Sequence, residues 1–238
     1  MALRVAFDLD GTIADMFVAL RKEAEQLFGA EELANADAAP LPNGEAAGAE
    51  KEDRDDKQAM AEMHLTARQQ MQLWEHVKTI ENFWSSLPEM EPGIVARIAT
   101  VATRRRWEII FLTTRPPVAG EMTQIQSQRW LEAHGFPLPS VFVVQRSRGK
   151  IADALHLDAV VDDRPENCLD VAVESKAKPI LIWSGDPKAI PPGAKRLGVR
   201  VATSISEALA LLEALDDLQH ESGVVRSIKK LFGKETPV

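Results

Sequence analysis

Residues 4–13 read Arg4-Val5-Ala6-Phe7-Asp8-Leu9-Asp10-Gly11-Thr12-Ile13, a short apolar run that stops at two carboxylates. The apolar residues before Asp8 have the size and branching of a central strand, and Gly11 permits the chain to turn away from the sheet. In an open α/β sheet, ligands bind outside the carboxyl ends of the strands, where Asp8 and Asp10 would lie. Side chains two apart on extended backbone point to the same face, so these two acids can share one small volume. The alternative is a solvated Asp-x-Asp turn that simply ends a strand.

Later apolar runs alternate with stretches of helical period along the second half of the chain. These runs cover residues 109–112, 141–144, 159–161, 179–183 and 199–202. Such alternation predicts an α/β protein with a Rossmann-like parallel sheet and helices on both faces. The last helix has a start signal, because Ser204 is followed three residues later by Glu207.

The chain between the first strand and residue 90 differs in composition from the rest. We expect a core formed by residues 1–15 and 90–217, with residues 16–89 inserted after the first strand as a helical cap. Helical periodicity covers residues 14–28 and 63–80 of this cap. Residues 31–62 are rich in alanine and acidic residues, which predicts a flexible acidic segment. Residues 218–238 form a C-terminal tail, in which 223–234 has the spacing of a short basic amphipathic helix.

Composition restricts the class of protein. A chain of 238 residues with 45% hydrophobic content can bury a full core. Its net charge of -8 argues against binding a nucleic-acid polymer, since basic surfaces supply most of that affinity. The single cysteine, Cys168, excludes an internal disulfide and fits a reducing compartment. No apolar run approaches the roughly 18 residues needed to span a bilayer, so we expect a soluble, cytoplasmic protein.

The run at 109–112 ends in Thr113-Thr114-Arg115-Pro116. A hydroxyl and a backbone N–H at a strand end can hold a phosphoryl oxygen, and an arginine can bind phosphate in a forked geometry. Thr113 is the preferred hydroxyl, with Thr114 as the alternative if the register is shifted by one. An ordinary surface turn has the same composition.

Two further strand ends carry charge. Lys150 follows the 141–144 run at the start of a helix, and Asp162 and Asp163 follow the 159–161 run. Taken alone, a lysine at a helix start is usually solvated. Adjacent acids after a strand are often a helix cap, and Pro165 suits the first turn of a helix.

Taken in order, these four strand ends resemble the four signatures of the haloacid dehalogenase (HAD) superfamily. The resemblance implies a phosphomonoester hydrolase in which Asp8 is the nucleophile and forms an aspartyl-phosphate, and Asp10 is the general acid and base. Thr113 would orient the transferring oxygens, and Lys150 would neutralise their charge. A magnesium ion, Mg²⁺, would be held by Asp8, by Asp10 through its backbone carbonyl, and by the acid pair. Within that pair the resemblance makes Asp163 the ligand and Asp162 its supporting neighbour.

A narrower resemblance, to the 5'(3')-deoxyribonucleotidase branch, rests on residues 10–15, on the segment from Phe83-Trp84 to Pro92-Gly93, and on 162–165. It implies a 5'-nucleotidase whose cap contacts a base, for which Phe17, Phe83 and Trp84 are the candidates. These aromatic residues are equally compatible with a core. The middle of the cap has no counterpart in that branch.

Other functions remain open from the sequence. The alternatives are a phosphotransferase or other HAD-type hydrolase acting on a small phosphorylated metabolite, and a non-catalytic member that binds a phosphorylated ligand or a protein. The presence of both Asp8 and Asp10 disfavours the non-catalytic alternative. A homodimer is an assembly that the sequence neither requires nor excludes.

Overall fold

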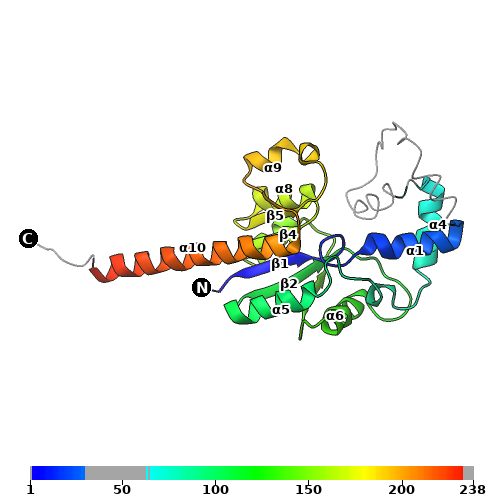
Figure 1. Cartoon of the computed structure of the whole chain (residues 1–238), viewed down its shortest axis with the longest axis horizontal. Helices are drawn as coiled ribbons and strands as arrows, with labels where there is room; N and C mark the ends of the chain where they lie inside the picture. The colour runs from blue at the N-terminus through cyan, green and yellow to red at the C-terminus, as the bar shows by residue number, and fades with distance from the viewer. Residues whose placement is uncertain (1, 30–62, 64, 233–238) are drawn as a thin grey trace, which may run out of the picture. The chain divides into compact units, whose positions relative to one another are not determined.

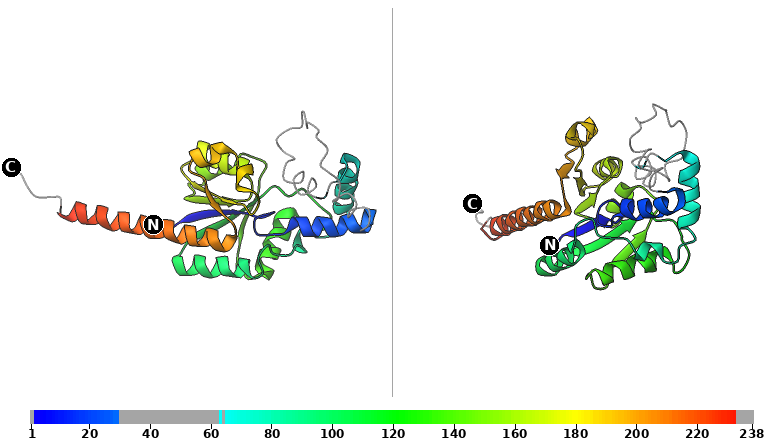
Figure 2. Two further views of the ribbon diagram at one scale, coloured as in Figure 1. Left: turned by 45° about the horizontal axis from the view of Figure 1, so that its top comes forward. Right: turned by 45° about the vertical axis from the view of Figure 1, so that its right-hand side comes forward.

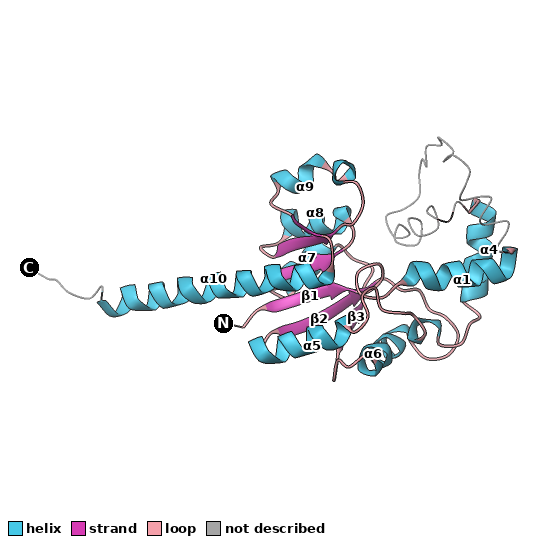
Figure 3. Cartoon of the chain, in the orientation of Figure 1, coloured by secondary structure: helices cyan, strands magenta, loops and turns pink. Residues whose placement is uncertain are grey.

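The computed structural model describes residues 2–29, 63 and 65–232, with the side chains of 219 and 221–232 left out. The acidic segment predicted at 31–62 lies outside the described residues. Strands and helices alternate along the chain after residue 93 (Figures 1 and 3). The elements are β1 (Arg4–Asp8), α1 (Met16–Phe28), α4 (Ala67–Val77), η1 (Phe83–Ser85), α5 (Ile94–Arg105), β2 (Glu108–Thr113), α6 (Thr123–Ala133), β3 (Ser140–Val143), α7 (Arg148–Ala154), β4 (Ala159–Asp162), α8 (Pro165–Glu174), β5 (Lys178–Ile182), η2 (Pro187–Ala189), α9 (Pro192–Arg196), β6 (Arg200–Ala202) and α10 (Ile205–Phe232).

Within the described residues, the strands form one six-stranded parallel sheet in the order β3-β2-β1-β4-β5-β6. Phe111 of β2 lies opposite Val141 of β3, and Val161 of β4 lies opposite Ile180 of β5. All four residues of β4 are buried, as expected for a parallel strand covered on both faces. The predicted α/β, Rossmann-like fold is confirmed.

Two helices have other bounds than those predicted. The helix predicted at 63–80 is shorter, because Thr66 and Gln69 form a capping box that starts α4 at Ala67. The segment that begins with Phe83-Trp84 contains the short helix η1. The helix predicted at 223–234 is not a separate element, since α10 continues to Phe232 (Figure 2).

The chain divides into two compact units, which we describe separately. Unit 1 comprises 1–6, 100–109 and 147–238, and unit 2 comprises 7–99 and 110–146. These units do not follow the predicted boundaries of core and cap, which stay a prediction. None of the helices in the described part of the chain is both long and apolar enough to cross a membrane.

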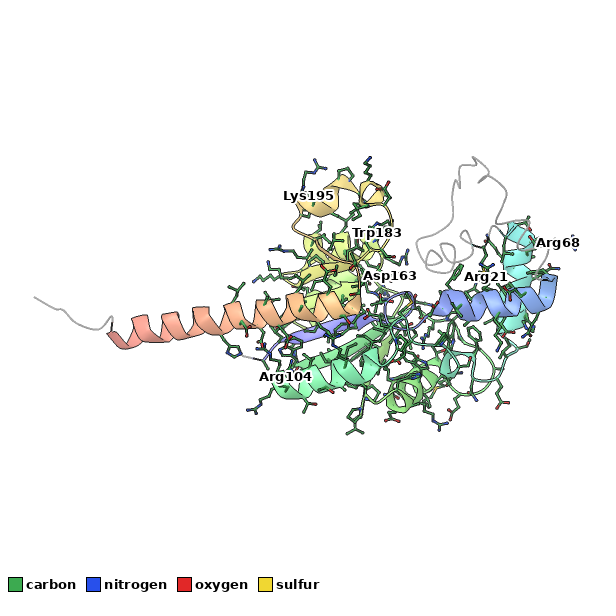
Figure 4. All side chains as sticks on the ribbon, in the orientation of Figure 1. Arg21, Arg68, Arg104, Asp163, Trp183 and Lys195 are labelled. Atoms are coloured by element: carbon green, nitrogen blue, oxygen red, sulfur yellow. The ribbon has the colours of Figure 1, made fainter. Side chains whose placement is uncertain are left out.

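In unit 1, α8 packs on β4 and β5, and α7 packs on α8. Gly149 permits this close approach of α7, because a Cβ added there would lie 2.2 Å from the carbonyl oxygen of Asp170. Ion pairs join the end of α5 to α10, among them Arg104 with Glu213 at 2.5 Å; Arg104 is labelled in Figure 4. Trp107 follows α5 and donates its indole N–H to the buried Asp216 at 3.0 Å.

In unit 2, α6 packs on β3 and on η1, and α1 packs on α4. The ring of Phe111 on β2 lies edge-on against Phe136, with ring centroids 4.9 Å apart. Trp130 of α6 donates its indole N–H to the carbonyl oxygen of Leu87 at 2.6 Å. These contacts fix α6 beside the residues that follow β2.

Candidate active site

Asp8 is the last residue of β1, and its side chain is almost completely buried. The chain reverses directly after it in a tight turn, in which the carbonyl oxygen of Leu9 accepts the N–H groups of Ile13 and Ala14 at 2.9 and 2.8 Å. Gly11 has a φ of 80°, a conformation that favours glycine. The turn predicted from Gly11 is therefore present, and it keeps Asp10 next to the end of the strand.

The carboxylate of Asp10 is held by two residues at the end of β2. Arg115 donates from Nε to both carboxylate oxygens at 2.9 Å and from Nη2 to Oδ1 at 2.7 Å. The hydroxyl of Thr113 donates to Oδ2 at 3.0 Å. Forked, charge-assisted bonds of this kind fix the orientation of a carboxylate as well as its position.

The guanidinium of Arg115 is completely enclosed. Its Nη1 donates to the hydroxyl of Ser127 at 2.9 Å, and its central carbon lies 5.0 Å from the centre of the Trp84 ring. In this structure the fork of Arg115 engages the carboxylate of Asp10, and its predicted contact with a phosphate stays a prediction.

Thr113 is the better choice of the two threonines for a role in the site. Its hydroxyl donates to Asp10 and accepts the backbone N–H of Arg115 at 3.2 Å, and the residue is buried. Thr114 is partly exposed. Direct contact of either hydroxyl with a phosphoryl oxygen stays a prediction.

The aromatic residues predicted to contact a base lie mainly in the core. Phe83 and Trp84 are buried and pack edge to face, with ring centroids 5.0 Å apart. The indole N–H of Trp84 donates to the carbonyl oxygen of Pro116 at 2.9 Å. These two rings therefore have the core packing that the sequence left open, and their contact with a base stays a prediction. Phe17 of α1 is half-buried.

In unit 1, Asp162 ends β4 with a side chain that is fully buried. Asn167 donates to both of its carboxylate oxygens at 3.0 Å, the backbone N–H of Arg164 donates at 2.9 Å, and Nε of Arg148 lies 3.6 Å away. Burial raises the pKa of Asp162, and the charge of Arg148 and these hydrogen bonds oppose that rise.

The two adjacent acids therefore have different capacities to bind a metal. Both oxygens of Asp162 already accept hydrogen bonds inside the protein, which favours the supporting role that the resemblance implies for it; which of the two acids binds a metal stays a prediction. Asp163 directly follows β4 and is partly exposed (Figure 4).

Lys150 lies in the first turn of α7, with an exposed side chain. Ser147 caps this helix and its hydroxyl donates to the carboxylate of Glu174 on α8. Arg148, two residues before Lys150, is buried, and its Nε lies 3.6 Å from the carboxylate of Asp162.

Three residues of these clusters were not predicted: Ser127, Arg148 and Asn167. Asn167 lies in the first turn of α8 five residues after Asp162, a spacing that a strand-turn-helix pattern brings back to the strand end. Arg148 could have been found only from its position, since it lies two residues before the predicted Lys150 at the start of a helix. For Ser127 on α6 the sequence carries no signal.

The metal ligands that the sequence predicts carry oxygen donors, the kind that a hard cation prefers. In unit 2 the carboxylate of Asp10 is engaged by Arg115, so its backbone carbonyl is the candidate ligand of that residue. The carboxylates of Asp8 and Asp163 stay predicted ligands. Magnesium prefers oxygen ligands and is usually held by one or two carboxylates plus water and phosphate. The described residues contain no group of three or more acidic, histidine or cysteine side chains placed to hold a metal.

Comparison with solved structures identifies proteins that share this fold. No family model matches the chain, and no curated protein is similar to it in sequence. A HAD-family hydrolase from Deinococcus radiodurans R1, solved with bound phosphate and sodium, superposes with a TM-score of 0.51 and 16% identity over 90% of this chain and 97% of that chain. A phosphonoacetaldehyde hydrolase-like protein from Oleispira antarctica superposes with a TM-score of 0.51 and 14% identity over 99% and 96%.

A dehalogenase solved with an intermediate complex gives a TM-score of 0.51 at 13% identity, over 88% of this chain and 96% of that chain. At these identities the similarity establishes the fold alone. The chain has the α/β fold of HAD-family hydrolases.

Proposed function

We propose that this protein is a magnesium-dependent phosphomonoester hydrolase that works through an aspartyl-phosphate on Asp8. The observation that carries the proposal is the state of the two acids at the end of β1. Asp8 is buried at the strand end, and two residues later the carboxylate of Asp10 is fixed by Arg115 and Thr113. One acid at the strand end and a second, oriented acid beside it are what a nucleophile and its proton-transfer partner require.

The order of the strands supports assigning the groups at their carboxyl ends to one function. Neighbouring parallel strands present their carboxyl ends at one edge, and β2, β1 and β4 are consecutive in the sheet. Asp8 belongs to the end of β1, Thr113 to the end of β2, and Asp163 follows β4.

In the proposed reaction, a carboxylate oxygen of Asp8 attacks phosphorus, and the bond from phosphorus to the leaving oxygen breaks. Asp10 gives its proton to that oxygen, so that an alcohol leaves. Asp10 then takes a proton from water as the water attacks the aspartyl-phosphate, which releases inorganic phosphate and restores Asp8.

The charge of the transferring group requires cations, because uncatalysed phosphate-monoester hydrolysis is among the slowest reactions known. We assign Lys150 to the phosphate oxygens, consistent with its exposed side chain in the first turn of α7. Magnesium, held by Asp8, Asp163 and the backbone carbonyl of Asp10, would supply charge neutralisation on the phosphoryl oxygens when bound.

The substrate class is open to a direct test. Phe83 and Trp84, two of the three aromatic side chains proposed to contact a base, are buried, so a 5'-nucleotidase is one specific form of the proposal. The experiment measures phosphate release by the purified protein from a panel of phosphomonoesters that includes nucleotides and sugar phosphates, with and without magnesium. We expect magnesium-dependent phosphate release from at least one ester. Release that persists in chelator would refute the metal requirement, and no release from any ester would refute the function.

A further inference from the structure

The guanidinium of Arg115 is the centre of a polar network in unit 2 that surrounds Asp10. One edge of the guanidinium binds Asp10, Nη1 binds Ser127, and the face lies over the ring of Trp84 at 5.0 Å. Arg115 is 3% exposed and Trp84 is 0% exposed, so the network is closed to water on those sides. Arg115 therefore has one anionic partner in this network, and it is an acid of the proposed reaction.

Ser127 and Trp84, which hold Arg115, are themselves fixed by hydrogen bonds. The hydroxyl of Ser127 donates to the carbonyl oxygen of Thr123, one turn earlier on α6, at 2.8 Å. The backbone N–H of Trp84 donates to the side chain of Gln126 at 3.1 Å. Because these anchors belong to α6 and η1, the position of Arg115 is set by packing away from the ends of β1 and β2.

We propose that Arg115 is a positioning residue for Asp10. It holds the carboxylate in the orientation needed for proton transfer to and from the leaving group, and Ser127 and Trp84 hold Arg115. The inference rests on the proposed function. Its physical basis is that a carboxylate on a short side chain rotates unless its oxygens are bound, and small displacements of a catalytic group are costly in rate.

This role differs from phosphate binding in what it changes. Loss of a phosphate ligand weakens substrate binding for every ester. Loss of orientation at Asp10 slows the step in which the leaving oxygen is protonated, so it lowers kcat more than it raises KM. Esters with poor leaving groups, such as alkyl phosphates, depend on that proton most, and p-nitrophenyl phosphate depends on it least.

The first test removes a holder of Arg115 and leaves Asp10 untouched. Ser127→Ala is expected to lower kcat for an alkyl phosphate about tenfold, with little change in KM and a smaller loss for p-nitrophenyl phosphate. The matched control is Ser175→Ala, because Ser175 makes the same kind of bond to the carbonyl oxygen one turn earlier, at 2.7 Å from Val171, without any arginine. The control should retain the wild-type rate. Equal losses in both variants would overturn the inference.

The second test is a double-mutant cycle between Arg115→Lys and Asp10→Asn. Arg115→Lys should lower kcat for the alkyl phosphate by about tenfold to a hundredfold in the wild type and cause no further loss in the Asp10→Asn background. A KM increase of the same size in both backgrounds would assign Arg115 to phosphate, and fully additive losses in kcat would separate it from Asp10. Either result overturns the inference.

Folding and function are controlled separately in this design. Circular dichroism and thermal unfolding check that each variant is folded. If Arg115→Lys does not fold, Ser127→Ala alone tests the inference. A wild-type protein that hydrolyses no phosphomonoester refutes the proposed function and with it this inference. An active wild type whose variants fail the cycle refutes the inference alone.

Discussion

Asp10 in unit 2 and Asp162 in unit 1 each lie at the end of a strand beside a buried arginine, yet the two carboxylates are bound differently. Arg115 engages Asp10 at 2.7 to 2.9 Å, and the side chain of Asp10 remains 9% exposed. Arg148 lies 3.6 Å from Asp162, whose carboxylate is completely enclosed and bound mainly by Asn167 and the backbone of Arg164.

The difference bears on the roles proposed for these acids. Asp10 is fixed but remains partly exposed, as the proton-transfer role proposed for it requires. Asp162 has both oxygens engaged inside the protein, whereas its neighbour Asp163 is partly exposed. Under the proposed function, Arg115 therefore supports a reacting acid and Arg148 supports a structural one. The following predictions test this distinction in order of expected effect.

The largest effect is expected for Asp8→Asn, which changes the last residue of β1, two residues before Asp10. The amide keeps the shape of the side chain but loses the nucleophilic charge, so phosphate release should fall by about 10⁴-fold or more while the protein remains folded. The measurement is phosphate release from the best ester of the panel. Asp15→Asn is the matched control, because Asp15 caps α1 through the N–H of Val18 and asparagine caps equally well. Substantial activity in Asp8→Asn would show that another residue attacks.

The second prediction compares separate substitutions of the two adjacent acids, Asp162 and Asp163. Asp163→Asn should raise the magnesium concentration for half-maximal activity by about 10- to 100-fold, because it removes a charged ligand, with little effect on the melting temperature. Asp162→Asn should instead lower the unfolding free energy by about 1 to 3 kcal/mol, because its amide nitrogen faces donors that now lack an acceptor. Magnesium titrations and denaturant unfolding measure the two effects. The reverse pattern would make Asp162 the ligand.

The third prediction concerns the pH dependence of stability. Burial raises the pKa of Asp162 above its ordinary value of 3.8, so the folded state holds this proton more tightly than the unfolded state. The stability contributed by the protonated group is complete below about pH 3.8 and is lost as the pH rises through the folded pKa. Unfolding free energies measured in chelator should therefore show the advantage of the wild type over Asp162→Asn shrinking as pH rises. A growing advantage would mean that Arg148 outweighs burial.

The smallest effect is expected for an exposed acid outside both clusters. Glu207 accepts the backbone N–H and the hydroxyl of Thr203 at 2.7 and 2.8 Å, and these bonds lower its pKa from the ordinary value of 4.5. Its contribution has the opposite sign to that of Asp162, since it is present above about pH 4.5 and is lost as pH falls. Glu207→Gln should flatten this acid-side loss slightly in the same unfolding series. A change as large as that of Asp162→Asn would contradict the distinction between buried and exposed acids.

The sequence alone was sufficient for the sheet and for the residues at its strand ends. The apolar runs at 109–112 and 159–161 correspond to β2 and β4, and Gly11 occupies the turn after β1. These features are local, because strand periodicity, turn residues and caps are set by neighbours a few positions away. Thr66 illustrates the limit of this reasoning, since its capping box starts α4 at Ala67 and the periodicity predicted a start at residue 63.

Only the tertiary structure decided which partner each polar side chain has. Arg115 and Asp10 are 105 residues apart in the sequence, and Trp84 reaches Arg115 from η1 in another part of unit 2. Forked binding suits a phosphate and a carboxylate equally well, so the residue type of Arg115 does not select between them. The selection depends on which anion the packing of α6 and η1 brings within reach, and a pairing between distant segments has no local signature in the chain.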